Sequence, residues 1–273
     1  MELNPFVFSC IMPHGGEIVP ELSGDDPSRM KKTRENAERL GQSMAETEPD
    51  AIVVVTPHGT RINGQFSIAD CERMVGYEEE NGTRFDMERK VERVLAAELT
   101  TEAKKAGLPA ASINFGTAEG SLSNLPLDWG AVVPLRFMPD VPIVVITPSR
   151  QVSMEDHLKF GKVLRETAEA SNRRIGLIAS CDWCHTHDDS GPYGYDPAAG
   201  PLDEEIVQLI KDNELEKMMD FDPERVEAAK PDGIWQALVL AGAIPKEERY
   251  VEFLSYEVPT YFGLICAAYP QGK

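Results

Sequence analysis

Short apolar runs that alternate with amphipathic segments are the feature that most limits how this 273-residue chain can fold. Strand-like apolar runs lie at residues 5–12, 51–56, 142–147 and 175–180, and the run AIVVVT at 51–56 is typical of a strand covered on both faces. Segments with helical spacing of apolar residues separate them, at 28–47, 86–106 and 153–170. This alternation predicts an α/β fold with a central, mostly parallel or mixed sheet flanked by helices.

The rest of the chain continues the pattern, without internal repeats or linker-like tracts, so we expect a single domain over residues 1–273. We expect further strands at 64–70, 249–256 and 262–269, and further helices at 203–212, 222–230 and 233–242. Ser153 is expected to cap the helix at 153–170, and His157 within that helix is expected on the surface.

Charge and cysteine content restrict the classes of function. The chain has 27 Lys and Arg against 46 Asp and Glu, a net charge of −19, which argues against binding nucleic acid or an anionic membrane. Its beginning has no secretory pattern, and no apolar stretch reaches the length of a membrane span. Five cysteines, an odd number, fit a reducing compartment, so we expect a cytoplasmic protein.

Three of the five histidines follow predicted strands. His14 follows 5–12, His58 follows 51–56 and His185 follows 175–180. Because ligands of open α/β sheets bind beyond the carboxyl ends of the strands, we expect these three loops to converge at one edge of the sheet. The alternative is that His14 and His58, both in Pro-His-Gly contexts, are structural turn residues.

Two neutral imidazoles and one carboxylate can hold Fe(II) and leave positions open for substrate and O2. The carboxylate has to come from another strand end. Glu257, which closes the predicted strand at 249–256, is the first choice, Glu252 is the second, and Glu17 is less favoured because it lies so near His14 in sequence. The C-x-x-C-H pattern at residues 181–185 matches a haem attachment motif, but we interpret it as a coincidence.

Several motifs in a fixed order carry a resemblance to a known family. They are MPHGG, TPHG, LPLDWGAVVPL, SCDWCH, GPYGYDPAAGPLDEEI, WQALVLAGA and LSYEVPTYFG. Together they resemble the catalytic subunits of the class III extradiol ring-cleavage dioxygenase superfamily. That superfamily includes protocatechuate 4,5-dioxygenase, 2-aminophenol dioxygenase and the Memo-like proteins. The resemblance extends over nearly the whole chain.

The resemblance implies that His14, His58 and Glu257 hold Fe(II) or Mn(II), with O2 as co-substrate. His185, in Asp182-Trp183-Cys184-His185, would be the acid and base in opening a catechol-like or aminophenol-like ring. From the residues themselves, we expect contacts to this small aromatic substrate from Trp129, His187 and Tyr195, and the alternative for His187 is a position in solvent. The resemblance also implies a homodimer or higher homo-oligomer, or a small accessory subunit.

One position departs from the family. Many members have Asp-His-Gly where this chain has Asp128-Trp129-Gly130, and an indole offers an N–H donor and a stacking surface but no base. Two alternatives therefore stay open. One is a Memo-like, metal-binding interaction protein without ring-cleaving activity, and the other is a metal-dependent hydrolase in which the metal activates water.

Overall fold

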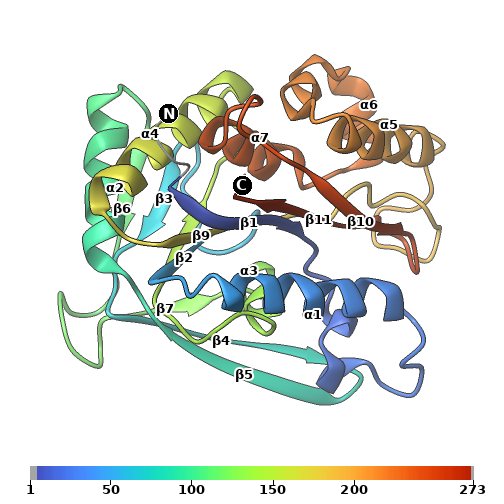
Figure 1. Ribbon diagram of the computed structural model, residues 1–273. Coiled ribbons are helices and arrows are strands. Elements are labelled where there is room, and N and C mark those ends of the chain that lie inside the picture. Colours follow the sequence, from blue (N-terminus) through green and yellow to red (C-terminus); the bar gives the residue numbers. More distant parts are fainter. Residues whose placement is uncertain (1–4, 272–273) are drawn as a thin grey trace.

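A mixed eight-stranded sheet forms the centre of the protein, whose computed structural model describes residues 5–271 (Figure 1). Its strands are β1 (Phe6–Met12), β2 (Ala51–Val55), β3 (Phe66–Ala69), β6 (Ala110–Ile113), β8 (Ile143–Thr147), β9 (Ile175–Ser180), β10 (Glu252–Glu257) and β11 (Leu264–Pro270). They are arranged in the order β10-β11-β1-β9-β2-β8-β3-β6. The four central strands β1, β9, β2 and β8 are parallel, so the expected α/β fold is confirmed.

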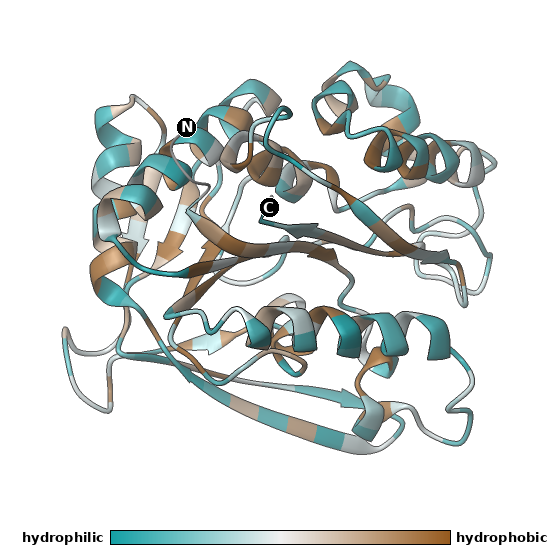
Figure 2. Ribbon diagram, viewed as in Figure 1, coloured by the Kyte–Doolittle hydropathy of each residue, from teal (hydrophilic) through white to brown (hydrophobic). Residues whose placement is uncertain are grey.

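Helices cover both faces of this sheet, as Figure 1 shows. One face packs on α1 (Lys31–Glu46) and α3 (Trp129–Leu135), and the other on α2 (Arg93–Lys105), α4 (Met154–Ser171) and α7 (Ile234–Ala243). Alternate residues of β2 supply the two cores, with Val53 and Val55 on one side and Ile52 and Val54 on the other. This explains the unbroken apolar run in the sequence, and Figure 2 shows the same concentration of hydrophobic residues on the strands.

A smaller sheet, which the sequence analysis did not predict, lies beside α3. It consists of β4 (Arg73–Glu80), β5 (Thr83–Lys90) and β7 (Asn124–Leu127), in the order β5-β4-β7. The prediction of a helix over 86–106 was therefore wrong in its first part, because residues up to Lys90 belong to β5 and the helix begins at Arg93. Asn81 and Gly82 join β4 to β5 with φ of 52° and 72°, as a tight hairpin turn requires.

The remaining helices follow the expected positions closely. They are α5 (Ala199–Lys211) and α6 (Pro223–Ala229), with short 3-10 helices at Gly16–Ile18, Pro20–Leu22 and Leu215–Asp220. The expected cap of α4 is confirmed, since Ser153 Oγ accepts a hydrogen bond from the backbone N–H of Asp156 at 3.1 Å. Over residues 5–271, no helix combines the length and the apolar character that crossing a bilayer requires.

His157 is buried, contrary to the expectation that it lies on the surface. Helical spacing places it on the same face of α4 as Phe160 and Leu164, and its ring meets the ring of Phe66 edge-on at 4.9 Å. Its Nδ1 lies 2.7 Å from the carbonyl oxygen of Ser153, to which it donates. Burial lowers the pKa of His157 to about 4, so this imidazole is a neutral core residue.

Close packing of α4 on α7 gives a first testable prediction. A Cβ added at Gly242 would lie 2.0 Å from the carbonyl oxygen of Leu158, a backbone atom that cannot move aside alone. We expect Gly242→Ala to lower the free energy of unfolding by about 1–3 kcal/mol, measured by urea denaturation. The control is Gly200→Ala in α5, where a Cβ meets nothing within 4 Å and stability is expected to stay the same or rise. Equal stability of the two variants would contradict this account.

Candidate metal centre

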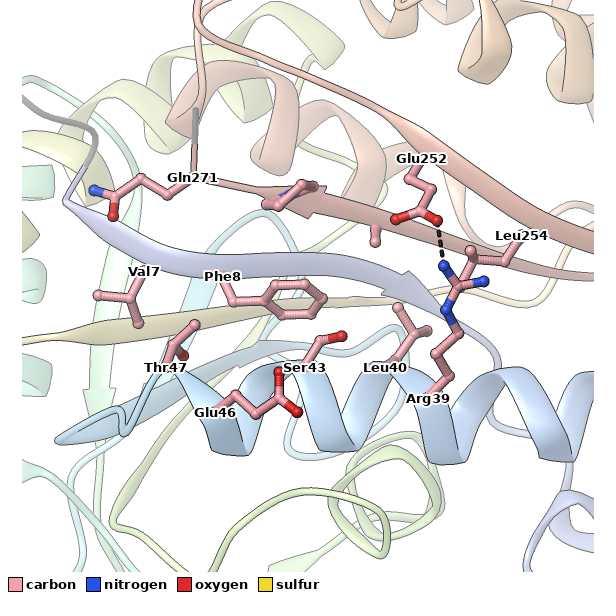
Figure 3. Close-up of a pocket in the computed structure, with 12 residues that line it drawn as sticks. Val7, Phe8, Arg39, Leu40, Ser43, Glu46, Thr47, Glu252, Leu254 and Gln271 are labelled. Carbon is pink, nitrogen blue, oxygen red and sulfur yellow. Dashed lines mark hydrogen bonds and ion pairs between the residues drawn. The ribbon is translucent and has the colours of Figure 1, made fainter. Parts of the chain in front are cut away.

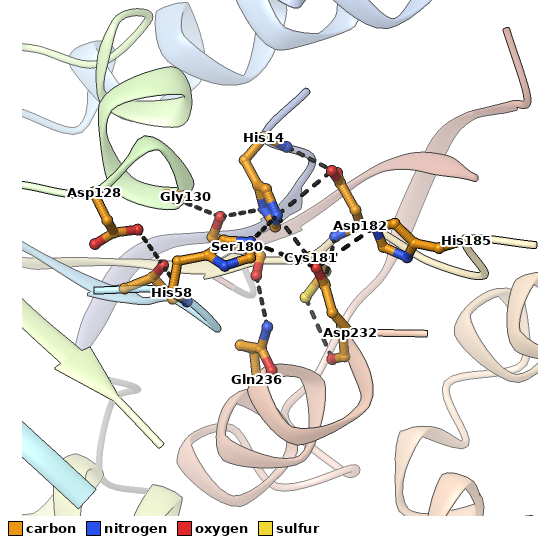
Figure 4. Close-up of polar contacts among 12 residues, drawn as sticks. His14, His58, Asp128, Gly130, Ser180, Cys181, Asp182, His185, Asp232 and Gln236 are labelled. Carbon is orange, nitrogen blue, oxygen red and sulfur yellow. Dashed lines mark hydrogen bonds and ion pairs between the residues drawn. The ribbon is translucent and has the colours of Figure 1, made fainter. Parts of the chain in front are cut away.

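Two of the three strand-end histidines meet at the carboxyl edge of the central sheet (Figure 4). His14 follows β1 and His58 follows β2, and their Nε2 atoms are 3.1 Å apart. Asp232 Oδ2 lies 3.3 Å from His14 Nε2 and 3.8 Å from His58 Nε2. One ligand atom from each of the three residues falls within 4.8 Å of the others, an arrangement that can hold a metal ion.

Asp232 was not found in the sequence analysis, because it lies between two helices and follows no strand. It occupies the connection from α6 to α7, and its Oδ1 accepts a hydrogen bond from the backbone N–H of Asp182 at 2.9 Å. A Cβ added at the next residue, Gly233, would lie 2.6 Å from Cys181 Cβ. The connection therefore packs directly on the end of β9. The sequence Pro-Asp-Gly before an apolar helix is a turn signature that could have drawn attention to it.

A second buried carboxylate, that of Asp182, lies beside the group formed by His14, His58 and Asp232. Its Oδ1 accepts from the backbone N–H of His14 at 2.9 Å, and its Oδ2 is 3.5 Å from His14 Nε2. Burial raises the pKa of Asp182, although the charge of His14 partly offsets it. For Asp232, burial also works against ionisation, but His14, His185 and His58 together outweigh it and the pKa is lowered. The site therefore holds two carboxyl groups away from water, and the ionised form is favoured at Asp232.

The two imidazoles respond to this environment in opposite directions. Burial alone would lower the pKa of His14, but Asp182 and Asp232 outweigh it and raise the pKa to about 9. Burial and the charge of His14 together lower the pKa of His58 to about 3. One positive charge is thus favoured where the nitrogen and oxygen atoms converge. A divalent cation at that point would compensate the buried carboxylates more completely.

The hydrogen bonds of His14 also fit a metal ligand. Ser180 Oγ donates to the carbonyl oxygen of Gly130 and lies 2.9 Å from His14 Nδ1. Since the Ser180 hydroxyl proton is used for Gly130, the hydroxyl oxygen accepts from Nδ1–H of His14. When a metal ion displaces the proton of Nε2, the lone pair of Nε2 faces His58 and Asp232, which is the tautomer that a metal ligand needs.

The hydrogen bond between His14 Nδ1 and the Ser180 hydroxyl makes Ser180 a positioning residue that can be tested. We expect Ser180→Ala to weaken the binding of a divalent metal ion by about 10- to 100-fold, because the imidazole of His14 loses the partner that fixes its tautomer. Metal titration followed by calorimetry measures the change. Ser171→Ala, which removes a hydroxyl bonded to Ala168 at the end of α4, is the matched control and should bind metal as the unmodified protein does. Unchanged metal affinity in Ser180→Ala would contradict this role of Ser180.

His185, from the loop after β9, joins the group from another side. Its Nδ1 donates to the carbonyl oxygen of Lys230 at 2.9 Å, and its Nε2 lies 3.9 Å from Asp232 Oδ2. Its ring stacks on that of Phe262, with 5.5 Å between centroids and 11° between planes. The three loops thus converge as expected. The fixed Nδ1 leaves Nε2 available to take or give a proton at the site.

Aromatic side chains surround the group. Trp129 stacks on His58 with 4.0 Å between ring centroids and remains 45% exposed. Tyr193 and Tyr261 each lie 6.1 Å from the ring of His185. The departure from Asp-His-Gly therefore places an indole surface, rather than a proton carrier, against one candidate ligand.

The glutamates considered as the third ligand are engaged elsewhere. Glu257 accepts hydrogen bonds from the backbone N–H of Thr33 in α1, at 2.8 Å, and from the Thr33 hydroxyl. Glu252 pairs with Arg39 across a separate cavity of about 320 Å³ between α1 and β10 (Figure 3). Glu17 pairs with Arg29 at 2.9 Å. The carboxylate that the structure brings to His14 and His58 is that of Asp232.

Two expected substrate contacts also have other positions. His187 Nε2 lies 2.8 Å from Oδ2 of the buried Asp203, which also accepts from the hydroxyl of Tyr256 at 3.0 Å. Tyr195 is 59% exposed, and within the described chain it is Tyr193, two residues earlier, that meets the ring of His185. His187 therefore anchors the loop after β9, and Tyr193 replaces Tyr195 beside the group.

The fold and the site together define an α/β protein with a candidate mononuclear metal centre at the carboxyl edge of its parallel strands. Residues 9–265 match the family described as the catalytic LigB subunit of aromatic ring-opening dioxygenase, and the chain belongs to this family. The resemblance noted in the sequence is thereby confirmed.

Individual relatives are more distant. Protein CA_C1420 from Clostridium acetobutylicum is 28% identical over 262 residues, which are 94% of this chain but 55% of that protein, so the chain spans about half its length. The 2-aminophenol 1,6-dioxygenase beta subunit from Pseudomonas sp. is 24% identical over 237 residues, 78% of this chain and 75% of that protein. The crystal structure of uncharacterized protein JW3007 from Escherichia coli K12 has the same fold, with a TM-score of 0.61, 15% identity and coverage of 96% of this chain and 99% of that one.

Proposed function

We propose that this protein is an Fe(II)-dependent extradiol dioxygenase that opens the ring of a catechol-like or aminophenol-like aromatic with O2. His14, His58 and Asp232 would hold the metal ion. The observation that carries the proposal is the convergence of these three ligand groups within 4.8 Å, with His185 Nε2 at 3.9 Å from Asp232, in a chain of the LigB family. The name of the Pseudomonas relative, a 2-aminophenol 1,6-dioxygenase beta subunit, supports the substrate class.

Metal binding would be carried out by the three ligands, and proton transfer and substrate contacts by the residues around them. A bound Fe(II) with two histidines and one carboxylate would supply open coordination positions for the substrate and for O2. His185, held through Nδ1 by the carbonyl of Lys230, would remove the proton of a substrate hydroxyl at Nε2 and return a proton when the ring opens. Trp129 and Tyr193 would hold the planar ring by their aromatic faces.

We also propose that this chain assembles with itself or with an accessory subunit and that it works in a reducing compartment. The Pseudomonas relative is named as a beta subunit, which supports a homodimer, a higher homo-oligomer or an assembly with an accessory subunit for this chain as well. All five cysteines are free and buried, which supports a reducing, cytoplasmic location.

The proposal is tested by reconstituting the protein with Fe(II) without oxygen and then adding O2 together with catechols, protocatechuate or aminophenols. We expect a new visible absorption from a ring-opened product and uptake of one O2 per ring. Metal binding without O2 uptake on any of these compounds would overturn ring cleavage and favour the Memo-like alternative. Hydrolysis of an ester or amide by the zinc-loaded protein, with no reaction of catechols, would instead indicate a hydrolase.

A further inference from the structure

We propose that a pocket beside the metal centre, carrying Arg61 and Arg150, binds a carboxylate on the side chain of the aromatic substrate. The inference rests on the proposed function and narrows its substrate to catechol-like or aminophenol-like acids. The pocket has a volume of about 440 Å³, which is within the range of small-molecule sites.

The pocket adjoins the candidate metal ligands along the chain and in space. The loop after β2 contributes Pro57, which directly precedes His58, and the start of α7 contributes Gln236, shortly after Asp232. The side-chain amide of Gln236 donates to the carbonyl oxygen of Ser180 at 3.0 Å, and Figure 4 shows it close to the histidine group. Its Oε1 is buried without a hydrogen-bond partner, which leaves one polar atom of the pocket wall unused.

The two arginines of this pocket lack the partners that arginines have elsewhere in the protein. Within residues 5–271, every other arginine donates to a carboxylate or to a backbone carbonyl, whereas Arg61 and Arg150 do neither. Both side chains are exposed and so can reach a ligand. In a chain of net charge −19, carboxylates are plentiful, so two adjacent unpaired guanidinium groups indicate a reserved anion site.

Nearby acidic groups do not neutralise this pair. The charges of Asp232 and Glu227 act on Arg150, but neither forms an ion pair with it. Glu227 pairs with Lys230, and Asp232 belongs to the candidate metal group. The cavity in Figure 3 provides the contrast, because there Arg39 is already paired with Glu252.

The geometry of Arg150 suits a carboxylate. Its guanidinium lies 4.4 Å from the centroid of the Trp235 ring, which supports it from one face and leaves its N–H edge free to donate. A guanidinium can donate two parallel hydrogen bonds to a carboxylate, and Arg61 adds a second positive charge across the same pocket. A neutral carboxamide of the same shape would gain much less binding free energy from these two arginines.

The test compares acids with their carboxamides on the Fe(II)-loaded protein without oxygen. The pairs are 3,4-dihydroxybenzoate and 3-(3,4-dihydroxyphenyl)propionate with the corresponding amides, titrated by calorimetry. We expect at least one acid to bind about 10-fold more tightly than its amide, and this preference to fall to about 2-fold or less in Arg150→Gln and in Arg61→Gln. Binding of the amides should change much less than binding of the acids in either variant, and binding of Fe(II) should not change.

Lys104→Gln is the matched control, since it removes one positive charge from the exposed surface of α2 and should keep the preference for the acid. Equal binding of acid and amide by the unmodified protein, or a preference that survives in the Arg61→Gln, Arg150→Gln double variant, would overturn the proposal.

Failure of the proposed function would be recognised separately. If neither acids nor amides bind the Fe(II)-loaded protein, the assigned substrate class is wrong, and the pocket is then tested with 3-phenylpropionate on the metal-free protein by ligand-observed NMR. Binding that is lost in the double arginine variant would support the anion pocket without the dioxygenase. Absence of binding to the unmodified protein would overturn the pocket as well.

Discussion

Replacement of Asp232 by asparagine is expected to weaken the binding of a divalent metal ion by at least about 100-fold, more than loss of a hydrogen-bond partner around the ligands would. Asparagine has nearly the same shape, and its side-chain oxygen can still accept from the backbone N–H of Asp182. The change therefore removes the anionic ligand while the connection between α6 and α7 stays packed on β9. His14→Ala and His58→Ala are also expected to lose metal, because each removes one imidazole ligand.

Glu257→Gln is the matched comparison, because Glu257 is the carboxylate that the sequence favoured. Its carboxylate accepts from Thr33 in α1, so we expect the glutamine variant to keep full metal affinity. Anaerobic Fe(II) titration of both variants, with thermal unfolding to confirm that each is folded, decides between the two residues. If Glu257→Gln loses metal and Asp232→Asn retains it fully, the third ligand is Glu257 and not Asp232.

The position of β10 explains why Glu257 was favoured and why it does not reach the histidines. Glu257 does end a strand, and β10 runs in the same direction as β1 because each is antiparallel to β11. However, β10 lies at the outer edge of the sheet, with β11 between it and β1. Neighbouring strands are about 4.8 Å apart, so β10 lies about 10 Å from β1. The sequence indicated that a strand ends there but not where that strand lies in the sheet.

His14, His58 and His185 could be found from the sequence because each follows a buried parallel strand, and such strands have an unmistakable apolar pattern. Asp232 could not be found in this way. Its place beside the histidines depends on the packing of α7 against β9, where Gly233 contacts Cys181 across a large separation in sequence. Local patterns contain no information about such a contact.

The hairpin β4–β5 was missed for a different reason. Met87 and Val91 are spaced as in a helix and continue into Leu95 of α2, so a helical period fitted residues 86–106. The same segment also alternates, with the charged Asp86 between Phe85 and Met87 and the charged Glu88 after them, as a strand does. The Asn81-Gly82 pair before it, with positive φ at both residues, was the signal that favoured the hairpin.

His185→Ala is expected to lower kcat for ring opening by about 10²- to 10⁴-fold while Fe(II) and substrate still bind, because a positioned acid and base contributes in this range. The basis is the asymmetry of its two nitrogens. Nδ1 is fixed by the carbonyl oxygen of Lys230, whereas Nε2 points toward Asp232 at a distance too long for a strong hydrogen bond. A proton can therefore be exchanged at Nε2 without loss of the orientation of the ring.

His187 provides the control within the same loop. Because His187 pairs with the buried Asp203, His187→Ala should lower stability and leave kcat of the folded enzyme within a few-fold of the unmodified value. Single-turnover rates with Fe(II) content measured in each sample separate the possible roles. Full activity in His185→Ala would remove His185 from the proton chemistry. Loss of Fe(II) in that variant would instead make His185 a fourth ligand, and the assignment of the proton to its Nε2 would then be wrong.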